Sequence, residues 1–363
     1  MFRKLVTLLL VSLCFFPMEL EAKRFKVIFL NPGHPQENST GNFWGNVTRF
    51  MEAAANDLDI ELVTIFAFRN HILMKSLIEE VVAQKPKYVV IVNEKGIALP
   101  MVKQLASRGI ASFMLLNNLS NSEIASLTDK EERLLVGSVV PNNYNAGRKL
   151  LNDLVLRYQS FNDDISLDSD ISLLALRGDY TTPASLARTQ GLTDAIKEHK
   201  RVIMIDSTVA NWSKQQAYQK VKGILRHTKL DIIWTANDAM AFGAKSAVME
   251  SKQKSRVMIG GINWDVDDPD YPVSVSYGGH VTLGAKSLAM IKDIENNLLP
   301  MNNRHQVIDI FTSSLSPYYV TFTERLKKDQ LKHYDFSHFS LSSEKAAPFT
   351  IKNITNSFDL LDD

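Results

Sequence analysis

The sequence is almost without cysteine, since Cys14 is the single one among 363 residues. Disulfide bridges, catalysis by a thiolate and zinc sites built from cysteine are therefore excluded. The eight histidines are scattered, and no two of them have the i, i+4 spacing of a zinc protease. We accordingly expect no bound metal and no cofactor.

The sequence also lacks a surplus of charge of either sign. Lysine and arginine number 41 against 40 aspartate and glutamate residues, which leaves a formal net charge of +1. Nucleic-acid-binding proteins usually carry a basic surplus or a basic stripe, so we expect no nucleic-acid partner. The hydrophobic content of 45% is ordinary for a soluble globular protein, and 363 residues are enough for two domains.

Motifs of the common nucleotide and hydrolase sites are absent as well. No glycine-rich phosphate loop or dinucleotide fingerprint follows a strand-like run, and no Gly-x-Ser-x-Gly elbow occurs. One acidic cluster resembles a calcium loop, but it lacks the glycine and the terminal glutamate of an EF-hand. We interpret it as a solvated loop; its residues are Asp265, Asp267, Asp268 and Asp270.

The first residues have the layout of a secretory signal peptide. Arg3 and Lys4 form a positive start, Leu5–Phe16 is largely apolar, and Ala22 ends a short, more polar segment. A membrane span needs about 20 apolar residues, and this run is shorter. We therefore expect residues 1–22 to be removed during export, together with the single cysteine.

From residue 25 onward, short β-branched runs alternate with amphipathic stretches. The apolar residues of 43–58 recur with the 3.6-residue period of a helix that is buried on one face. Several of the runs are apolar throughout, which suits strands buried on both faces of a parallel sheet. Alternation of this kind, in two series, predicts two α/β lobes with doubly wound parallel sheets. The expected strands are Phe25–Leu30, Ile60–Phe66, Tyr88–Val92, Ile110–Leu116, Leu134–Val140, Ile171–Leu176, Val202–Asp206, Asp231–Thr235, Val257–Ile262 and Val273–Ser276.

Aromatic, amide and arginine side chains follow many of the expected strands. In an open α/β sheet, ligands bind beyond the carboxyl ends of the strands, so these residues are candidates for a binding site. Aromatic rings suit the apolar C–H faces of a sugar, and planar amides and guanidinium groups suit its hydroxyls. The candidate ligand-binding residues are Asn42, Phe43, Trp44, Asn117, Asn118, Arg188, Trp212, Asn237, Asp238 and Asn263.

Each candidate also has a purely structural interpretation. Asn42, Asn237 or Asp238 could be the N-cap of the helix that follows it. The aromatic residues could belong to the core, and Arg188 could form a salt bridge on the surface. Their recurrence at the same end of the expected strands favours a shared site over these separate roles.

Five segments of the chain are similar to segments of one known protein family. They are residues 41–44 (GNFW), 187–192 (ARTQGL), 211–212 (NW), 234–244 (WTANDAMAFGA) and 257–263 (VMIGGIN). Together they resemble the periplasmic binding protein type I family, in its ribose-type branch, over nearly the whole mature length. The resemblance implies that the aromatics of the first segment sandwich a sugar ring and that the arginine of the second segment binds the sugar.

The resemblance implies a fold of two doubly wound lobes joined by three chain crossings. The first lobe would comprise residues 23–140 and 278–310, and the second lobe residues 141–277 and 311–331. Residues 332–363 lose the alternation of strands and helices, so we expect a surface arm or a partly disordered tail there. Closure of the lobes on a ligand would be the functional event.

The sequence departs from the ribose-type pattern at several positions. Asn117 and Asn118 stand where an acidic residue and an arginine are expected, and Asn263 stands where an aspartate is expected. An amide accepts on one side and donates on the other, so we expect a ligand other than ribose, or ribose held differently. The periplasmic autoinducer-2 receptor is also similar, but the second arginine that this resemblance implies is missing near Gly278, where no long polar side chain is present.

These inferences predict a periplasmic protein that captures a small, neutral, sugar-like ligand. Two partners are open: the permease of an inner-membrane ABC importer, or the periplasmic domain of a sensor protein, as for an autoinducer-2-type receptor. The unusual tail and the altered sugar pattern favour sensing.

An enzyme and a repressor are the two alternatives to a binding protein. We expect no enzymatic activity, because a glycosidase needs two carboxylates and the expected cleft offers only Asp238; a carbohydrate-active enzyme is the remote alternative. A cytoplasmic repressor of the same family would carry a helix-turn-helix ahead of its first strand, and the expected signal peptide leaves no room for one.

Overall fold

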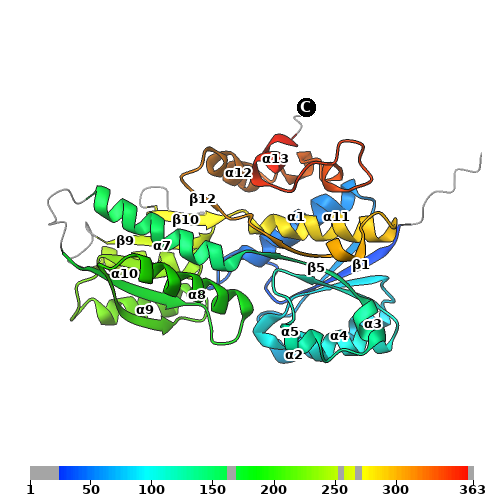
Figure 1. Cartoon of the computed structure of the whole chain (residues 1–363), viewed down its shortest axis with the longest axis horizontal. Helices are drawn as coiled ribbons and strands as arrows, with labels where there is room; N and C mark the ends of the chain where they lie inside the picture. Colours follow the sequence, from blue (N-terminus) through cyan, green and yellow to red (C-terminus); the bar gives the residue numbers. More distant parts are fainter. Residues whose placement is uncertain (1–23, 162–168, 252–256, 266–271, 359–363) are drawn as a thin grey trace, which may run out of the picture.

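The computed structural model describes residues 24–161, 169–251, 257–265 and 272–358. In this part of the chain, two six-stranded sheets carry helices on their faces and form two lobes that lie next to each other (Figure 1). The two doubly wound α/β lobes expected from the sequence are confirmed. The expected signal peptide, with Cys14, lies outside the described residues. No helix within the described ranges is long and apolar enough to cross a membrane.

The first sheet is parallel throughout and is buried on both faces. Val27 and Phe29 belong to the core on one face, whereas Ile28 and Leu30 belong to the core on the other. This two-sided burial is the reason for the continuous apolar runs. In spatial order the strands are β11 (His305–Ile308), β5 (Leu135–Pro141), β4 (Ala111–Leu115), β3 (Tyr88–Ile91), β1 (Lys26–Asn31) and β2 (Glu61–Phe66).

The helices of the first lobe divide between these two cores. The first core contains residues of α1 (Phe43–Asp57) and α11 (Leu283–Glu295). The second contains residues of α2 (His71–Ser76), α3 (Ile78–Ala83) and α4 (Ala98–Ser107). Two short helices that start with capping boxes and two 3₁₀ turns complete the lobe: α5 (Asn121–Ile124), α6 (Asp129–Leu134), η1 (Glu94–Gly96) and η3 (Met301–Asn303).

The second sheet repeats this plan with one antiparallel strand at its edge. In spatial order its strands are β12 (Thr312–Ser313), β10 (Val275–Gly278), β9 (Met258–Asn263), β8 (Ile232–Thr235), β6 (Ile171–Arg177) and β7 (Val202–Val209). Only β12 runs antiparallel to its neighbour. The helices are α7 (Asn143–Ser160), α8 (Pro183–Glu198), α9 (Lys214–Ile224) and α10 (Asp238–Met249).

Helices α7 and α8 cross at two glycines. A Cβ atom at Gly147 would lie 2.0 Å from the carbonyl oxygen of Arg188, and one at Gly191 would lie 2.0 Å from that of Tyr144. No side chain fits at either position, so the two helices approach backbone to backbone. This contact fixes the position of Arg188 relative to α7.

The chain passes between the lobes at three places, as the resemblance implied. The crossings follow β5, β10 and β11, and the second of them leads into the 3₁₀ turn η2 (His280–Thr282). All of the strands expected from the sequence are present, with small shifts at their ends. The sequence did not indicate β11 and β12, because β12 has two residues and β11 alternates exposed with half-buried positions.

The C-terminal residues pack onto the first lobe, above α1 and α11 in Figure 1. Phe322 stacks on Phe50 of α1 with ring centroids 5.5 Å apart, and Phe336 is only 1% exposed. The elements of this segment are α12 (Pro317–Lys327), η4 (Leu331–His333), η5 (Ser337–Phe339) and α13 (Ile351–Asn356).

This packing corrects two expectations. Residues 332–358 are not a surface arm or a disordered tail, and residues 317–327 pack against the first lobe instead of the second. The buried aromatics of the segment follow neither the 2-residue period of a strand nor the 3.6-residue period of a helix. Their burial depends on a distant surface, the outer face of α1, and a local pattern does not indicate that.

We expect Phe336→Ala to lower the free energy of unfolding by about 3–5 kcal/mol, because the substitution removes buried contacts and leaves a cavity. Leu341, 48% exposed in the same segment, is the matched control, and Leu341→Ala should cost less than about 1 kcal/mol. Urea denaturation followed by circular dichroism measures both changes. Equal, small effects would show that the segment does not contribute to the folded core.

Candidate functional site

A pocket lies between the two lobes, beyond the carboxyl ends of strands from both sheets. Most of the predicted ligand-binding residues meet there: Phe43, Trp44, Asn117, Arg188, Trp212, Asn237 and Asn263. Their contact with a ligand stays a prediction. The lining residues that sequence reasoning missed are Thr40, Arg69, Glu94, Leu116, Pro141, Asn143, Thr182, Ala184 and His280.

Arg188 is buried at the junction of the lobes, with 4% of its surface exposed. It donates to Asn143 Oδ1 (2.9 Å) and to the carbonyl oxygen of Ala236 (2.6 Å). Its guanidinium also lies over the rings of Trp212 and Phe311, 5.9 and 5.5 Å from their centroids. Burial lowers the pKa of Arg188 to about 9, so the group stays charged at neutral pH. The interpretation as a surface salt bridge is therefore wrong.

His280, in the hinge, is the lining residue that sequence reasoning most clearly missed. Its Nε2 lies 3.2 Å from Nη2 of Arg188, and its ring stacks on Phe43 at 4.8 Å and 29°. Burial, and then the charge of Arg188, hold the pKa of His280 well below its usual value, so the ring is neutral. Because arginine can only donate, Nε2 must accept and Nδ1 must carry the proton. No motif accompanies this histidine in the sequence.

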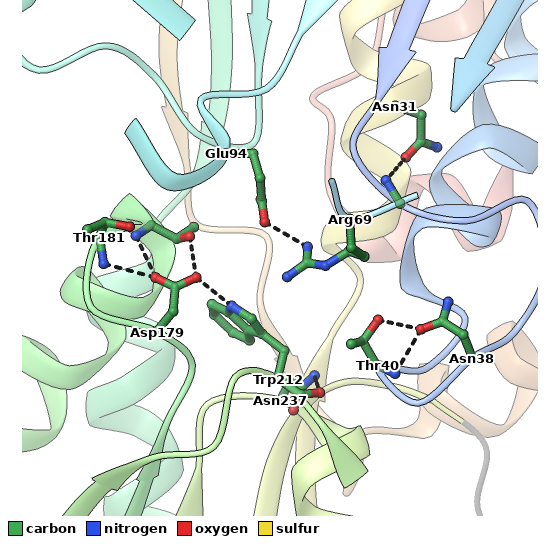
Figure 2. Close-up of polar contacts among 11 residues, drawn as sticks. Asn31, Asn38, Thr40, Arg69, Glu94, Asp179, Thr181, Trp212 and Asn237 are labelled. Carbon is green, nitrogen blue, oxygen red and sulfur yellow. Dashed lines mark hydrogen bonds and ion pairs between the residues drawn. The ribbon is translucent and has the colours of Figure 1, made fainter. Parts of the chain in front are cut away.

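Trp212 is held in place by a carboxylate and a glycine. Its Nε1 donates to Asp179 Oδ2 at 2.8 Å (Figure 2). A Cβ at Gly178 would lie 2.2 Å from the indole ring. Burial acts to raise the pKa of Asp179, but hydrogen bonds from Thr182, Trp212 and Thr181 hold it below its ordinary value. Asp179 is thus an ionised acceptor that orients the indole.

The asparagines of the pocket have different roles. Asn237 is the N-cap of α10: its Oδ1 accepts from Met240 N at 3.0 Å, and its Nδ2 donates to the carbonyl oxygen of Trp212 at 3.1 Å. Asn117 Oδ1 accepts from Ala184 N of the opposite lobe at 3.0 Å, which leaves its Nδ2 for another acceptor. The N-cap interpretation is confirmed for Asn237, which nevertheless lines the pocket.

An ion pair that the sequence did not indicate also lines the pocket. Arg69, from the segment between β2 and α2, lies 2.8 Å from Glu94 of η1, and Glu94 is 4% exposed (Figure 2). The expectations of a single arginine, and of Asp238 as the only carboxylate of the cleft, are therefore wrong. Both residues lie in loops without any hydrophobic period, and only the approach of the two segments brings them together.

Three predicted ligand-binding residues lie outside the lining of this pocket. The side chain of Asn42 donates to Asn46 Oδ1 at 3.3 Å, and that of Asn118 donates to Ser138 Oγ at 3.2 Å. Asp238 is fully buried and accepts from Ser276 Oγ at 2.7 Å. The side chains of successive residues in a turn point in different directions. Each of these three residues therefore faces away from the pocket, whereas its neighbour in the chain lines the pocket.

Asp265, the one residue of the acidic cluster that lies within the described residues, forms part of the junction between the lobes. A Cβ at Gly41 of the first lobe would lie 2.9 Å from Asp265 Oδ2. Burial raises the pKa of Asp265 to about 6; the hydrogen bond from Asn263 acts to lower this pKa, and the charge of Glu37 acts more weakly to raise it. Asp267, Asp268 and Asp270 lie outside the described residues, within which no group of three potential metal ligands occurs.

The lobes are in direct contact on both sides of the pocket. Ala184 N donates to Asn117 Oδ1 at 3.0 Å, and Lys214 N donates to the carbonyl oxygen of Ser39 at 2.9 Å. Together with the hydrogen bond of Arg188 to the hinge, these contacts define a closed arrangement. The pocket can enclose a small molecule and surround it with aromatic faces and hydrogen-bonding groups.

Known proteins share this architecture. Residues 35–268 match the periplasmic binding protein domain family. A periplasmic sugar-binding protein from Pseudomonas fluorescens superposes with a TM-score of 0.78 and 28% identity, covering 91% of this chain and 99% of that one. The binding protein of the arabinose ABC transporter from Shewanella sp. ANA-3, bound to L-arabinofuranose, superposes with a TM-score of 0.67 and 17% identity, covering 85% and 98% of the two chains.

A curated relative matches over a shorter length. The D-apiose import binding protein of Actinobacillus succinogenes is 22% identical over 216 residues, which cover 56% of this chain and 59% of the relative. The chain thus spans less than two thirds of the length of that relative. The family match is longer. It runs from the segment before α1 to the segment after β9 and includes strand ends on both sides of the pocket. The chain therefore belongs to the periplasmic binding protein family.

Proposed function

We propose that the protein binds one small, neutral, sugar-like molecule between its lobes. The observation that carries the proposal is a pocket that is lined by aromatic rings of both lobes and by a buried, hydrogen-bonded guanidinium. Phe43 and Trp44 come from the first lobe, and Trp212 comes from the second. Such rings suit the C–H faces of a sugar. The charge of Arg188 is stabilised by protein oxygens and aromatic faces, so the ligand itself need not be an anion.

The names of the relatives support a sugar as the ligand. They name the five-carbon sugars D-apiose and L-arabinofuranose, the six-carbon sugars galactofuranose and D-allose and, for the Pseudomonas fluorescens protein, a sugar without further identity. Donors in the pocket that have no acceptor among the described residues suit the oxygens of such a ligand; they are the Nδ2 groups of Asn117 and Asn143. Because furanose forms recur among these names, we propose a sugar that is bound in its furanose form.

Closure of the lobes would be the output of binding. A ligand contacts one lobe first and then bridges to the other. It stabilises the closed arrangement relative to the open one by the difference between its binding free energies for the two arrangements. The relatives are named as import binding proteins, which supports delivery of the ligand in the periplasm to the permease of an ABC importer. The sequence-based preference for sensing is weaker now, because the segment that suggested it is part of the folded first lobe.

One observation keeps the autoinducer-2-type ligand as a second candidate. That resemblance implied a second arginine near Gly278. Arg69 comes from a different part of the chain, but it also lines the pocket. It is paired with Glu94 at 2.8 Å, so its donors are partly used within the protein. We therefore rank a plain sugar first and include autoinducer-2 in the test.

We also propose that no chemistry is performed on the ligand. A glycosidase needs a carboxylic acid that keeps its proton and a second carboxylate across the same bond. Asp179 is held ionised by its hydrogen bonds, Glu94 is engaged by Arg69, and Asp238 lies outside the pocket. None of these groups is placed as a general acid.

We expect D-apiose, L-arabinose, D-galactose or another sugar of this size to raise the melting temperature of the purified protein, because a ligand that binds only the folded chain stabilises it. At a ligand concentration of 100 Kd the gain in free energy is about 2.7 kcal/mol. Differential scanning fluorimetry with pentoses, hexoses, polyols and autoinducer-2 makes the measurement. A panel without any shift would refute the proposed ligand class, and a shift with autoinducer-2 alone would favour the second candidate.

Arg188→Ala should weaken binding of the active sugar at least about 100-fold, since it removes a charged donor from a buried site. Arg148→Ala removes the same charge from the exposed face of α7, where the guanidinium pairs with Glu198, and should leave affinity within about twofold. Isothermal titration calorimetry measures both, and circular dichroism verifies that each variant is folded. Equal affinities for the two folded variants would place Arg188 outside the binding site.

Ligand affinity should depend on the ionisation of Asp265. Closure places its carboxyl against Gly41 and near Glu37, and burial and that charge raise its pKa to about 6, whereas a hydrated aspartate titrates near about 3.9. The raised pKa means that protonation favours closure, so this contribution is complete below about pH 3.9 and is lost as the pH rises through about 6. We expect about tenfold weaker binding at pH 7.5 than at pH 4.5, measured by calorimetry. Asp265→Asn should remove the difference, and an unchanged pH profile in that variant would contradict this role.

A further inference from the structure

The charged groups at the pocket differ in how completely they are bonded within the protein. Arg188 uses all of its side-chain nitrogen atoms, since Nε and Nη1 donate to oxygens and Nη2 lies 3.2 Å from His280 Nε2. Asp179 accepts from Trp212 Nε1 and from both the main-chain N–H and the hydroxyl of Thr182. The hydrogen-bonding needs of these two groups are therefore met by the protein itself.

Arg69 and Glu94 form a pair that is bonded less completely. Arg69 Nη1 lies 2.8 Å from Glu94 Oε1, and the two side chains are only 18% and 6% exposed. Glu94 Oε1 nevertheless accepts no hydrogen bond, so the contact between the two groups is one of charge alone. Within the described ranges the guanidinium has no other partner. Both groups line the pocket and thus keep hydrogen-bonding capacity for a molecule inside it.

The main chain around Arg69 is held in an unfavourable conformation. Phe68 and Arg69 are both left-handed, with φ of 51° and 59°, which brings the Cβ atom of an L-residue too close to the main chain. Phe68 N donates to the carbonyl oxygen of Gly33 at 2.9 Å, and Arg69 N donates to that of Pro32 at 2.7 Å. Strain of this kind is found mostly at functional sites, where the surroundings fix the direction of a side chain. Here the segment after β1 holds the guanidinium at the pocket, beside the carboxylate of Glu94 (Figure 2).

The pair belongs to the first lobe alone. Arg69 lies between β2 and α2, and Glu94 lies in η1, which follows β3. Phe43, at the start of α1, lines the pocket from the same lobe, whereas Trp212 and Arg188 come from the second lobe. The pair is therefore complete before the lobes close, and a ligand can contact it in the open arrangement.

We propose that Arg69 and Glu94 bind two hydroxyl groups on neighbouring carbon atoms of the sugar. The guanidinium donates to the oxygen of one hydroxyl, and the carboxylate accepts the proton of the other. A donor from the ligand also meets the need of a buried acceptor that the protein leaves unpaired. A carboxylate or phosphate on the ligand would instead be repelled by the charge of Glu94. The inference rests on the proposed function and narrows the ligand to a neutral sugar in which both of these hydroxyl groups are free.

The test is isothermal titration calorimetry with whichever of D-apiose, L-arabinose and D-galactose binds most tightly, and with the monodeoxy derivatives of that sugar. Arg69→Met and Glu94→Gln should each weaken binding of the parent sugar at least about tenfold, because a charge-assisted hydrogen bond is lost. One monodeoxy derivative should bind Arg69→Met and the wild-type protein with affinities within about twofold of each other, since the hydroxyl that Arg69 contacts is already missing. The derivative without the neighbouring hydroxyl should be insensitive to Glu94→Gln in the same way.

Arg148→Met and Glu198→Gln are the matched controls, because they make the same substitutions in an exposed ion pair of the second lobe and should leave affinity unchanged. Circular dichroism verifies folding, and Glu94→Gln, which keeps the shape of the side chain, decides the matter if Arg69→Met does not fold. A purely structural role would weaken the parent sugar and every derivative by the same factor, and that result would overturn the proposal. Insensitive positions that are not on neighbouring carbons would overturn it too. Failure of all three sugars to bind the wild-type protein would overturn the proposed sugar ligand and, with it, this inference.

Discussion

A guanidinium that is buried between two lobes must have its N–H groups satisfied, and much of this structure follows from that requirement. An unpaired buried charge costs several kcal/mol, so the partners of Arg188 are as strongly constrained as the residue itself. They come from three places: the start of α7 (Asn143), the turn after β8 (the carbonyl of Ala236) and the hinge (His280). Two of these belong to the second lobe and the third to the connection between the lobes, so Arg188 relates the angle of the hinge to the shape of the pocket. The tautomer of His280 is a consequence of the same contact.

The predictable parts of this protein are those whose physical cause is local. Tyr88–Ile91 is apolar throughout because it is buried on both faces, and Trp212 was found because it follows a strand end. His280, Arg69 and Glu94 were missed because their burial depends on segments that approach from elsewhere in the chain. The C-terminal aromatics were misjudged for the same reason: they pack on the outer face of α1, far earlier in the chain, as Phe322 does on Phe50. The sequence indicates which residues can bind a sugar, but not which of two neighbours in a turn faces the ligand.

The C-terminal segment also contacts a residue of the second lobe. Trp264, in the segment that follows β9, is 1% exposed and packs edge-on against Tyr319 and Phe322 of α12, with ring centroids 5.5 and 5.3 Å apart. A Cβ at Gly278, in the hinge, would lie 2.1 Å from the same indole. The indole thus fills the space between a hinge strand and the C-terminal helix, one residue after Asn263 at the pocket. The segment that looked like a tail is part of the support of the site.

The two glycines at the crossing of α7 and α8 have a consequence for how this protein can change over generations. Because Gly147 and Gly191 admit no side chain, mutation at either position displaces a whole helix, and with it the charge of Arg188. Other lining residues of the pocket, such as Asn117 and Asn263, sit at strand ends, where an exchange leaves the crossing of the two helices unchanged. Selection can therefore retune which molecule is accepted, one contact at a time, while the distance between the helices stays invariant. Related proteins would therefore differ in the amides and aromatics of the pocket and keep glycine at the positions of Gly147 and Gly191.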